Sequence, residues 1–257
     1  MSKLDMKKYG LIKKYYNEST LSDKQKIGRI ISKESENYKV ITELGVTAAE
    51  VSGKFKYEAT TPADYPVVGD FVVVEFNQQT ADSTIQQILK RKNALIRKGE
   101  WDVNFDHVVA ANIDTIFICL KLDNDFNIEK LQAYISIASK INSEQVVVLT
   151  ECDSFSNIDI ILNEVKEHTK GMDVIVTSGM DGDGCRSVKS YIHEGKTIAF
   201  IGPEHDKIKI IDKLLGDINL KNDLVLLSGG GVLINTPEMR ELGIESVNTT
   251  KKFADIR

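Results

Sequence analysis

Four short polar segments in the second half of the chain have residue types suited to nucleotide chemistry. Each follows an apolar run: 150–153 (TECD), 178–184 (SGMDGDG), 202–209 (GPEHDKIK) and 235–238 (NTPE). A carboxylate accepts hydrogen bonds from the N–H groups of a base, glycine-rich turns present backbone N–H groups to phosphate, and a lysine neutralises phosphate charge. If the fold brings the four segments together, they predict one nucleotide site.

The elements around these segments predict a parallel sheet that would do so. Strand candidates are 115–120, 146–150, 173–177, 197–202, 224–227 and 232–235, and helical segments at 128–141, 158–167, 185–192 and 206–215 fill most of the gaps. Near-continuous apolar strands that alternate with amphipathic helices indicate a mostly parallel sheet covered on both faces. Binding sites in such sheets lie at the carboxyl ends of the strands, where all four segments fall.

The first half of the chain has a different pattern. Residues 1–24 mix Lys, Tyr, Leu and Ile at helical spacing and predict a helical arm. Residues 25–92 hold about five short β-rich runs separated by turn residues, and one of these runs, 46–55, is read as a single strand. A small closed barrel is the economical arrangement, of which the OB-fold is the commonest and an SH3-like barrel the alternative. Residues 93–107 are expected to form a basic linker, and 108–257 the sheet domain.

Composition limits the classes of function. With 33 basic and 38 acidic residues and a net charge of -5, the protein is not expected to coat nucleic acid by bulk charge, and no DNA partner is predicted. The three cysteines are far apart and lack C-x-x-C spacing, so neither disulfides nor a zinc site is predicted. No targeting or membrane-spanning run is present, so a cytoplasmic protein without membrane contact is expected. A monomer is also expected.

The first two polar segments resemble the guanine-reading motifs of GTPases. Thr150 and Asp153 match the [NT]-K-x-D motif, whose Asp reads the guanine N–H groups, but Glu151 stands in place of the lysine. Ser178 and Gly179 begin a loop similar to S-A-x-x-G-x-G, which contacts the guanine oxygen through backbone N–H groups. The other reading of an Asp after a strand is a helix cap.

The third segment resembles a Walker A phosphate loop, G-x-x-x-x-G-K-[ST], that has lost its second glycine. Anchoring on Gly202 places Ile208 at the lysine position, whereas anchoring on the helix places Lys207 there, with a loop one residue short. The second alignment is preferred because the apolar positions of residues 210–215 fix the helix. Pro203 has no N–H, so a phosphate-binding nest is not expected here.

The fourth segment, which includes Thr236, resembles the D-T-P-G motif of GTPases with its working groups replaced. Asn235 stands where the Asp orders magnesium water, and Glu238 stands where the Gly donates to the γ-phosphate. Magnesium binding and catalysis are therefore not predicted, and no catalytic residue is assigned. The alternative is an ordinary hairpin followed by a helix start, with Thr236 and Pro237 as its cap and first residue.

The guanine motifs precede the phosphate loop, which precedes 235–238, whereas ordinary GTPases run the other way. This rotated order after a barrel resembles the ribosome small subunit-dependent GTPase A (RsgA-type) family of circularly permuted GTPases, which act late in 30S assembly. Further matches are 51–55, 67–70, 91–92, 108–115, 124–127 and 253–256. The resemblance implies an α/β protein: an N-terminal OB-like β-barrel followed by a circularly permuted P-loop GTPase-type α/β domain.

Two further departures from the family pattern bear on activity. The threonine-rich switch segment is missing, because only residues 217–223 separate Gly216 from the next strand, and the family's C-terminal zinc domain is expected to be absent. The resemblance then implies a pseudo-GTPase with weak GTP or GDP binding and negligible hydrolysis. A working GTPase that uses Lys207 and a nucleotide-free protein-binding scaffold are the alternatives.

RNA contact is the remaining expectation from sequence. The small ribosomal subunit or its RNA is the partner that the resemblance implies. Basic residues on the barrel and in the linker supply a local patch that phosphates could contact, despite the acidic average. The candidates are Lys54, Lys90, Arg91, Lys92, Arg97 and Lys98.

Overall fold

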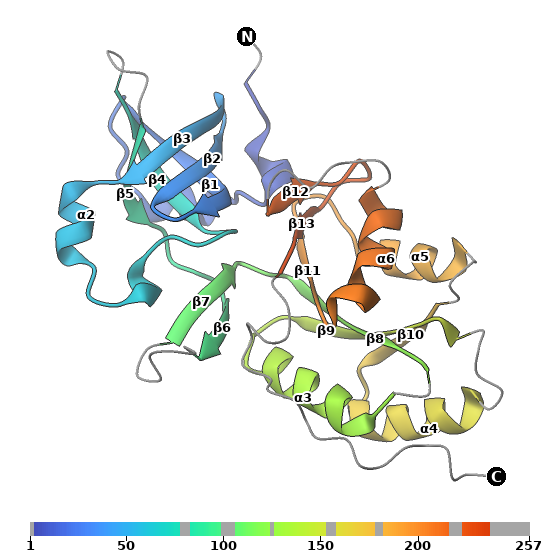
Figure 1. Cartoon of the computed structure of the whole chain (residues 1–257). Helices are drawn as coiled ribbons and strands as arrows, with labels where there is room; N and C mark the ends of the chain where they lie inside the picture. The colour runs from blue at the N-terminus through green and yellow to red at the C-terminus, as the bar shows by residue number, and fades with distance from the viewer. Residues whose placement is uncertain are drawn as a thin grey trace.

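The computed structural model describes residues 3–77, 83–98, 106–123, 126–152, 158–177, 182–215 and 223–236. A β-barrel stands beside a mixed α/β domain, with a small two-stranded sheet adjoining both (Figure 1). The predicted order of a barrel followed by an α/β domain is confirmed. None of the helices in the described ranges combines the length and apolar character that a membrane span requires.

The barrel closes through five strands in the order β1-β2-β3-β5-β4. Their bounds are β1 Gln25–Glu34, β2 Asn37–Thr42, β3 Gly45–Val51, β4 Phe71–Phe76 and β5 Ser83–Ile88. β1 pairs antiparallel with β4, and β3 pairs in parallel with β5, so no strand edge is left open. Its interior is filled by fully buried side chains, among them Ile30, Val40, Val72, Val74 and Ile85. This closed five-stranded barrel supports the OB-like prediction over the SH3-like one.

A short helix, α2 (Gly53–Glu58), connects β3 toward β4, and a 3-10 turn, η2 (Pro62–Asp64), follows it. The prediction of one strand over 46–55 was therefore wrong at its end, because β3 stops at Val51. The hydroxyl of Ser52 accepts a hydrogen bond from the backbone N–H of Phe55 at 3.2 Å and begins the helix. The hydrogen bond to the Ser52 side chain therefore favours a helix start at this point over a continuation of β3.

The α/β domain holds six strands in the order β10-β9-β8-β11-β13-β12. They are β8 Thr115–Lys121, β9 Glu144–Thr150, β10 Asp173–Val176, β11 Thr197–Ile201, β12 Leu224–Leu226 and β13 Val232–Ile234. All neighbours pair in parallel except β12 with β13, which form an antiparallel hairpin at one edge. The predicted strands are thus present, and the carboxyl ends of the five parallel strands lie at one edge, whereas that of β12 lies at the opposite edge.

Helices cover both faces of this sheet, α3 and α4 on one and α5 and α6 on the other (Figure 1). Their bounds are α3 Ile128–Ala138, α4 Ile158–Thr169, α5 Gly182–Lys189 and α6 Glu204–Leu215. Alternate residues of each strand point to opposite faces. Accordingly Ile116 and Ile118 pack with the α3 and α4 side, and Phe117 and Cys119 with the α6 side.

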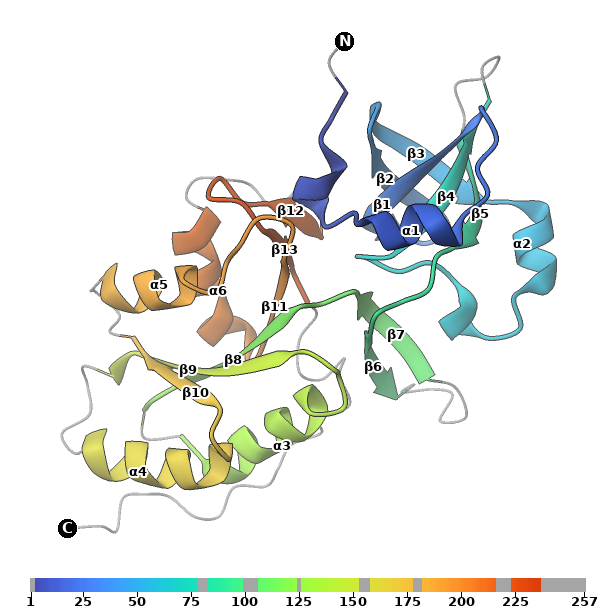
Figure 2. The ribbon, with the colours of Figure 1, turned by 180° about the vertical axis from the view of Figure 1, so that it is seen from behind.

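The segment before the barrel forms two short helices, η1 (Met6–Tyr9) and α1 (Lys13–Glu18). Seen from behind, they lie against the barrel on the side of the sheet domain (Figure 2). Met6, Leu11 and Tyr15 are buried, and the Tyr15 ring lies 4.4 Å from that of Phe71. The N-terminal segment is thus an integral part of the core.

The segment predicted as a basic linker contains a strand, β6 (Ala94–Lys98), which pairs antiparallel with β7 (Asp106–Ala111). Leu95 is fully buried within this two-stranded sheet. Residues 99–105 lie outside the described ranges. Arg97 and Lys98, two of the basic residues that follow the barrel, therefore belong to a strand.

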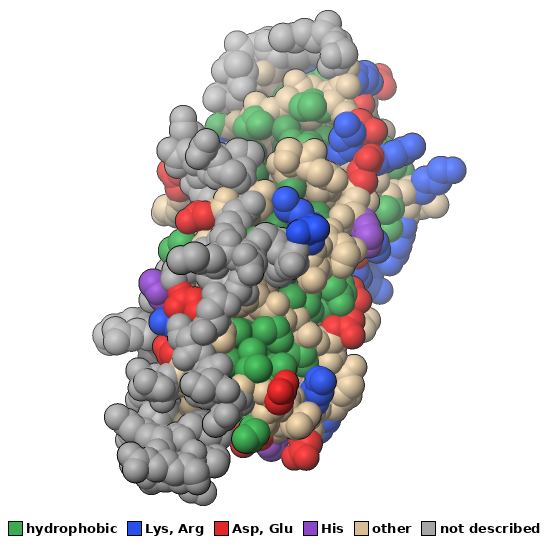
Figure 3. Space-filling view, turned by 90° about the vertical axis from the view of Figure 1, so that its right-hand side faces the viewer, with side chains coloured by type: hydrophobic (Ala, Val, Ile, Leu, Met, Phe, Trp, Pro, Cys, Tyr) green, Lys and Arg blue, Asp and Glu red, His purple; other side chains and the backbone are tan. Residues whose placement is uncertain are grey.

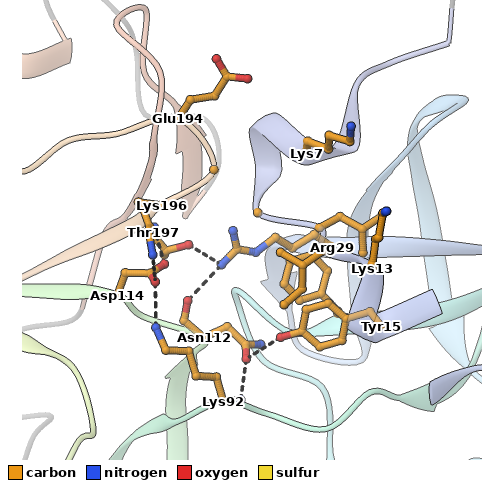
Figure 4. Close-up of a pocket in the computed structure, with 15 residues that line it drawn as sticks. Lys7, Lys13, Tyr15, Arg29, Lys92, Asn112, Asp114, Glu194, Lys196 and Thr197 are labelled. Atoms are coloured by element: carbon orange, nitrogen blue, oxygen red, sulfur yellow. Dashed lines mark hydrogen bonds and ion pairs between the residues drawn. The ribbon is translucent and has the colours of Figure 1, made fainter. Parts of the chain in front are cut away.

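Arg29 of β1 joins the N-terminal segment, the barrel and the sheet domain (Figure 4). Its side chain is fully buried, and it donates to the carbonyl oxygens of Gly69, Tyr9 and Asn112 and to Oγ1 of Thr197, at 2.7 to 3.4 Å. Its guanidinium carbon also lies 4.9 Å from the centre of the Phe71 ring. Burial lowers the pKa of Arg29 to about 10.

A second buried charge, Asp70, is paired with Arg91. The two nitrogens Nε and Nη2 of Arg91 donate to the two carboxylate oxygens of Asp70 at 2.8 and 2.7 Å. Arg91 also donates to the carbonyl oxygens of Ala63 and Tyr65, and the N–H of Val67 donates to Asp70 at 2.9 Å. The pair therefore holds the η2 turn onto the barrel.

We expect the substitution Asp70→Asn to lower the free energy of unfolding by about 3 kcal/mol, because it leaves the half-buried Arg91 charge without its counter-charge. Urea unfolding of the purified chain measures this. The matched control is Glu36→Gln, which breaks the pair of Glu36 with Lys56, similarly short at 2.6 Å but exposed. No measurable change is expected there, and equal losses in both variants would contradict the burial argument.

Candidate functional site

The described ends of the four polar segments follow strands of the sheet at its carboxyl edge. The N–H of Cys152 donates to the carbonyl oxygen of Thr177 at 3.3 Å, which joins the ends of β9 and β10. Lys207 of α6 contacts Thr236 beyond β13, which joins the third segment to the fourth. The predicted residues Asp153, Ser178 and Gly179 lie outside the described ranges.

Gly202 and Pro203 alone separate β11 from α6, which begins at Glu204. The helix therefore starts earlier than the predicted bound at residue 206. Gly202 has a φ of +146°, and a Cβ atom at this position would clash with the carbonyl oxygen of Cys119. Gly202 thus allows β11 to pack closely against β8. Lys207 lies in the first turn of α6.

The Lys207 side chain is fully buried, and its Nζ donates to the carbonyl oxygen of Thr236. Thr236 is also buried, and its hydroxyl donates to the carbonyl oxygen of Phe200 in β11. The lysine thus holds residue 236 against the sheet. In a phosphate loop this cation would lie against the phosphates instead.

Asp206 places a carboxylate at the start of α6. Its Oδ2 accepts a hydrogen bond from the backbone N–H of Lys121, at the end of β8, at 2.9 Å. The side chain is only 8% exposed, and burial raises its pKa. Helix N-termini attract anions, so Asp206 supplies an internal anion beside the position where a phosphate would bind.

The end of β9 is held by local contacts. Thr150 is buried, and its carbonyl oxygen accepts from the N–H of Leu122 at 2.8 Å. Glu151, which replaces the lysine of the base-reading motif, has a φ of +57° and pairs with Nζ of Lys121 at 2.9 Å. No group of three or more His, Cys, Asp or Glu side chains suited to a metal ion occurs in the described part of the chain.

The six RNA candidates lie in different settings. Lys54 is exposed on α2, beside Glu58 at 3.7 Å, and Lys90 is exposed after β5. Arg91 is occupied by Asp70, and Lys92 pairs with Asp114 at 2.7 Å. The backbones of Arg97 and Lys98 lie in β6, and their side chains lie outside the described parts. The structure thus separates exposed candidates from residues that hold the fold.

Sequence reasoning missed the polar junction around Arg29. Asn112, which has a φ of +60°, donates to the carbonyl oxygen of Gly69 at 3.0 Å and accepts from the N–H of Lys92 at 2.8 Å. The hydroxyl of Tyr15 also lies 3.3 Å from its Oδ1. One sequence signal was available, since an arginine interrupts the apolar run 27–31 of β1.

A family model and individual relatives identify the same family. The family model described as RsgA GTPase matches residues 88–223. Small ribosomal subunit biogenesis GTPase RsgA 2 of Lactiplantibacillus plantarum is 34% identical, and the alignment covers 98% of this chain and 76% of that protein. Small ribosomal subunit biogenesis GTPase RsgA of Opitutus terrae is 27% identical, over 82% of this chain and 66% of its own length.

Two crystal structures share the fold. YjeQ from Thermotoga maritima matches with a TM-score of 0.67 and 22% identity, over 83% of this chain and 75% of that one. YloQ, described as a circularly permuted GTPase, matches with a TM-score of 0.63 and 20% identity, over 87% and 76%. The predicted circular permutation of the α/β domain is therefore confirmed at the level of the fold.

The raised pKa of Asp206 predicts that Asp206→Asn stabilises the protein near neutral pH. A carboxyl whose pKa is higher in the folded state than its ordinary 3.8 loses stability as the pH rises from that value through the folded-state pKa. The side-chain amide oxygen of this variant can still accept the hydrogen bond from the backbone N–H of Lys121. Urea midpoints at pH 4 and pH 7 should show a larger gain for the variant at pH 7.

Asp114→Asn is the control with the opposite sign. Burial raises the pKa of Asp114, but hydrogen bonds from Lys92, Thr197 and Lys196 outweigh it and hold the pKa below its ordinary value. Its contribution to stability is present above pH 3.8 and is lost as the pH falls through the folded-state pKa, so this variant should be less stable at pH 7. Destabilisation of both variants at pH 7 would contradict the assignment of Asp206.

Proposed function

This chain belongs to the RsgA GTPase family, and we propose that it is a small ribosomal subunit assembly factor with a reduced nucleotide site. In this proposal it binds GTP or GDP weakly, hydrolyses GTP at a negligible rate and needs no magnesium. The proposal rests on the family and on one contact at the sheet edge. Relatives named small ribosomal subunit biogenesis GTPases supply the partner.

The contact that carries the proposal is the hydrogen bond from Lys207 to the carbonyl oxygen of Thr236. Phosphoryl transfer depends on positioning and charge neutralisation by a lysine, converging backbone N–H groups and a metal ion. Here the lysine is buried against the protein's own backbone, and Pro203 occupies the short connection to α6. A phosphate could gain Lys207 only by displacing residue 236.

The internal charges at this edge support the same conclusion. Asp206 lies in the first turn of α6, and Glu151 lies beyond β9, so both segments that would face a nucleotide present carboxylates. Carboxylates repel phosphate, and Lys121, the cation beside Glu151, is already paired with that carboxylate at 2.9 Å. Residual affinity is therefore assigned to the guanine end, through Asp153 and the loop that begins at Ser178 and Gly179.

Contact with RNA is assigned to the barrel. Lys54 and Lys90 are exposed there, and the pair of Lys54 with Glu58 is long, at 3.7 Å, and exposed. Arg91 and Lys92 instead lie 2.7 Å from the less exposed carboxylates of Asp70 and Asp114. The face shown in Figure 3 is the side of the sheet domain, and basic and acidic side chains are interspersed there. That face offers no continuous basic surface among its described residues. A local contact by a few exposed lysines of the barrel predicts a modest dependence on salt.

We expect GMP, GDP and GTP to bind with similar affinities, within about threefold, with or without magnesium. The phosphates gain little where Lys207 is occupied, whereas Asp153→Asn should reduce the preference for guanine by about 1 to 3 kcal/mol, because a base reader loses its acceptor. Titration of the purified chain with labelled nucleotides, and with the adenine analogues as the control for base recognition, measures both effects.

The outcome that contradicts this proposal is turnover. Phosphate release from GTP above the buffer background, over several turnovers, would show a working GTPase if it were lost in both Lys207→Met and Asp153→Asn. Circular dichroism of each variant establishes that it is folded. A chain that binds no guanine nucleotide at all would favour the scaffold reading.

We expect the chain to co-sediment with small ribosomal subunits at low salt, and the double variant Lys54→Ala/Lys90→Ala to bind several-fold more weakly. Each lost phosphate contact should reduce the salt slope by somewhat less than one. The matched control is Lys140→Ala/Lys166→Ala, which removes two exposed lysines from the sheet domain. Equal weakening in both double variants, or no co-sedimentation at low salt, would overturn the assignment to the barrel.

A further inference from the structure

A cavity of about 580 Å³ lies where the N-terminal segment, the barrel and the sheet domain meet. It is distinct from the carboxyl edge of the sheet, because its residues from the sheet domain precede β8 or β11 or begin β11, at the amino ends of these strands. Lys7 and Lys13 come from the N-terminal segment, Arg29 from β1, and Lys196 from the sheet side, around a common space (Figure 4).

The lining of this junction pocket is basic in a protein whose net charge is negative. Five basic side chains line it, with only two acidic ones, Asp114 and Glu194. Asp114 already pairs with Lys92 at 2.7 Å and Lys196 at 3.2 Å. Of the carboxylates in the described ranges, none lies within ion-pair distance of Lys7 or Lys13, and both lysines are exposed. The pocket therefore has a local excess of positive charge.

Arg29 adds a buried cation to this wall without a contacting counter-charge. Within the described structure no carboxylate lies within 4 Å of its guanidinium, and its four hydrogen-bond acceptors are three carbonyl oxygens and a hydroxyl. These use four of its five N–H groups, and Nη1 lies beside Gly10, behind the wall of the pocket. A buried charge is costly without a partner of opposite sign, and an anion in the pocket would offset that cost by Coulomb attraction without contacting the guanidinium.

Two glycines allow the N-terminal segment to approach the sheet domain closely beside Arg29. Gly10 has a φ of +81° and Gly195 a φ of +74°, and both line the pocket. A Cβ atom on Gly10 would lie 3.3 Å from Nη1 of Arg29 and 3.0 Å from the carbonyl oxygen of Gly195, so protein atoms already fill the space next to the guanidinium. The pocket therefore lies outside this close contact, and Arg29 acts on it through its charge.

We propose that the junction pocket binds a small phosphate-bearing anion, of the pyrophosphate or nucleotide class. The two exposed lysines, Lys7 and Lys13, would contact the phosphates, and the buried charge of Arg29 would attract them from behind the wall. The volume lies within the range usual for small-molecule sites, and Leu11 and Phe71 give the pocket an apolar wall for a non-phosphate part. Such a ligand contacts all three parts of the protein, so it stabilises their arrangement.

Inorganic pyrophosphate without magnesium is the probe, titrated calorimetrically into the full chain at about 0.15 M salt, where weak surface charge effects are screened. We expect saturable binding to the wild type and at least tenfold weaker binding to Lys7→Ala/Lys13→Ala. Lys140→Ala/Lys166→Ala, which removes two lysines distant from the pocket in sequence, should bind as the wild type does. Arg29→Met should also weaken binding, and circular dichroism verifies that it is folded.

Lys207→Met distinguishes this pocket from the sheet edge. Its affinity for pyrophosphate should equal that of the wild type, and loss of binding in Lys207→Met with retention in Lys7→Ala/Lys13→Ala would overturn the proposal. So would absence of saturable binding to the wild type, or equal affinity in the two double-lysine variants. A parallel titration with GDP in Asp153→Asn, which removes the guanine reader at the sheet edge, identifies the source: tighter binding than pyrophosphate assigns a nucleotide, and equal or weaker binding assigns the free anion.

Discussion

The burial of Arg29 is the constraint on which the arrangement of this protein depends. A guanidinium removed from water needs its hydrogen bonds satisfied, and its acceptors come from the N-terminal segment, the barrel and the sheet domain. Each of these parts must therefore be in place before the charge is accommodated. The aromatic ring of Phe71 and the backbone of Asn112 complete the surroundings.

Several residues that carry the family resemblance serve this junction. Asp70 binds Arg91, Asn112 binds the backbone at Gly69 and Lys92, and Asp114 binds the N–H of Thr197 at the start of β11. These contacts fix how the barrel meets the sheet. Asp70, Asn112 and Asp114 therefore have a structural reason to match the family pattern, because their contacts set how the barrel packs against the sheet domain.

The described polar groups at the carboxyl edge of the sheet bind one another. Lys207 donates to Thr236, Asp206 accepts from Lys121, and Glu151 pairs with the Lys121 side chain. A ligand would have to replace these internal contacts and so would gain only the difference in free energy. The junction pocket differs, since Arg29 and its neighbouring lysines leave positive charge unpaired by the described carboxylates.

The barrel, the six sheet strands and their helices could be predicted from the amino-acid sequence. These features follow from local periodicity, because strands and helices bury side chains at different spacings. The partners of Arg91 and Lys207 within the protein and the burial of Arg29 could be seen only in the folded chain. Sequence gives the charge of a side chain, whereas its exposure and its partner depend on residues far along the chain, such as Thr197, 168 positions from Arg29.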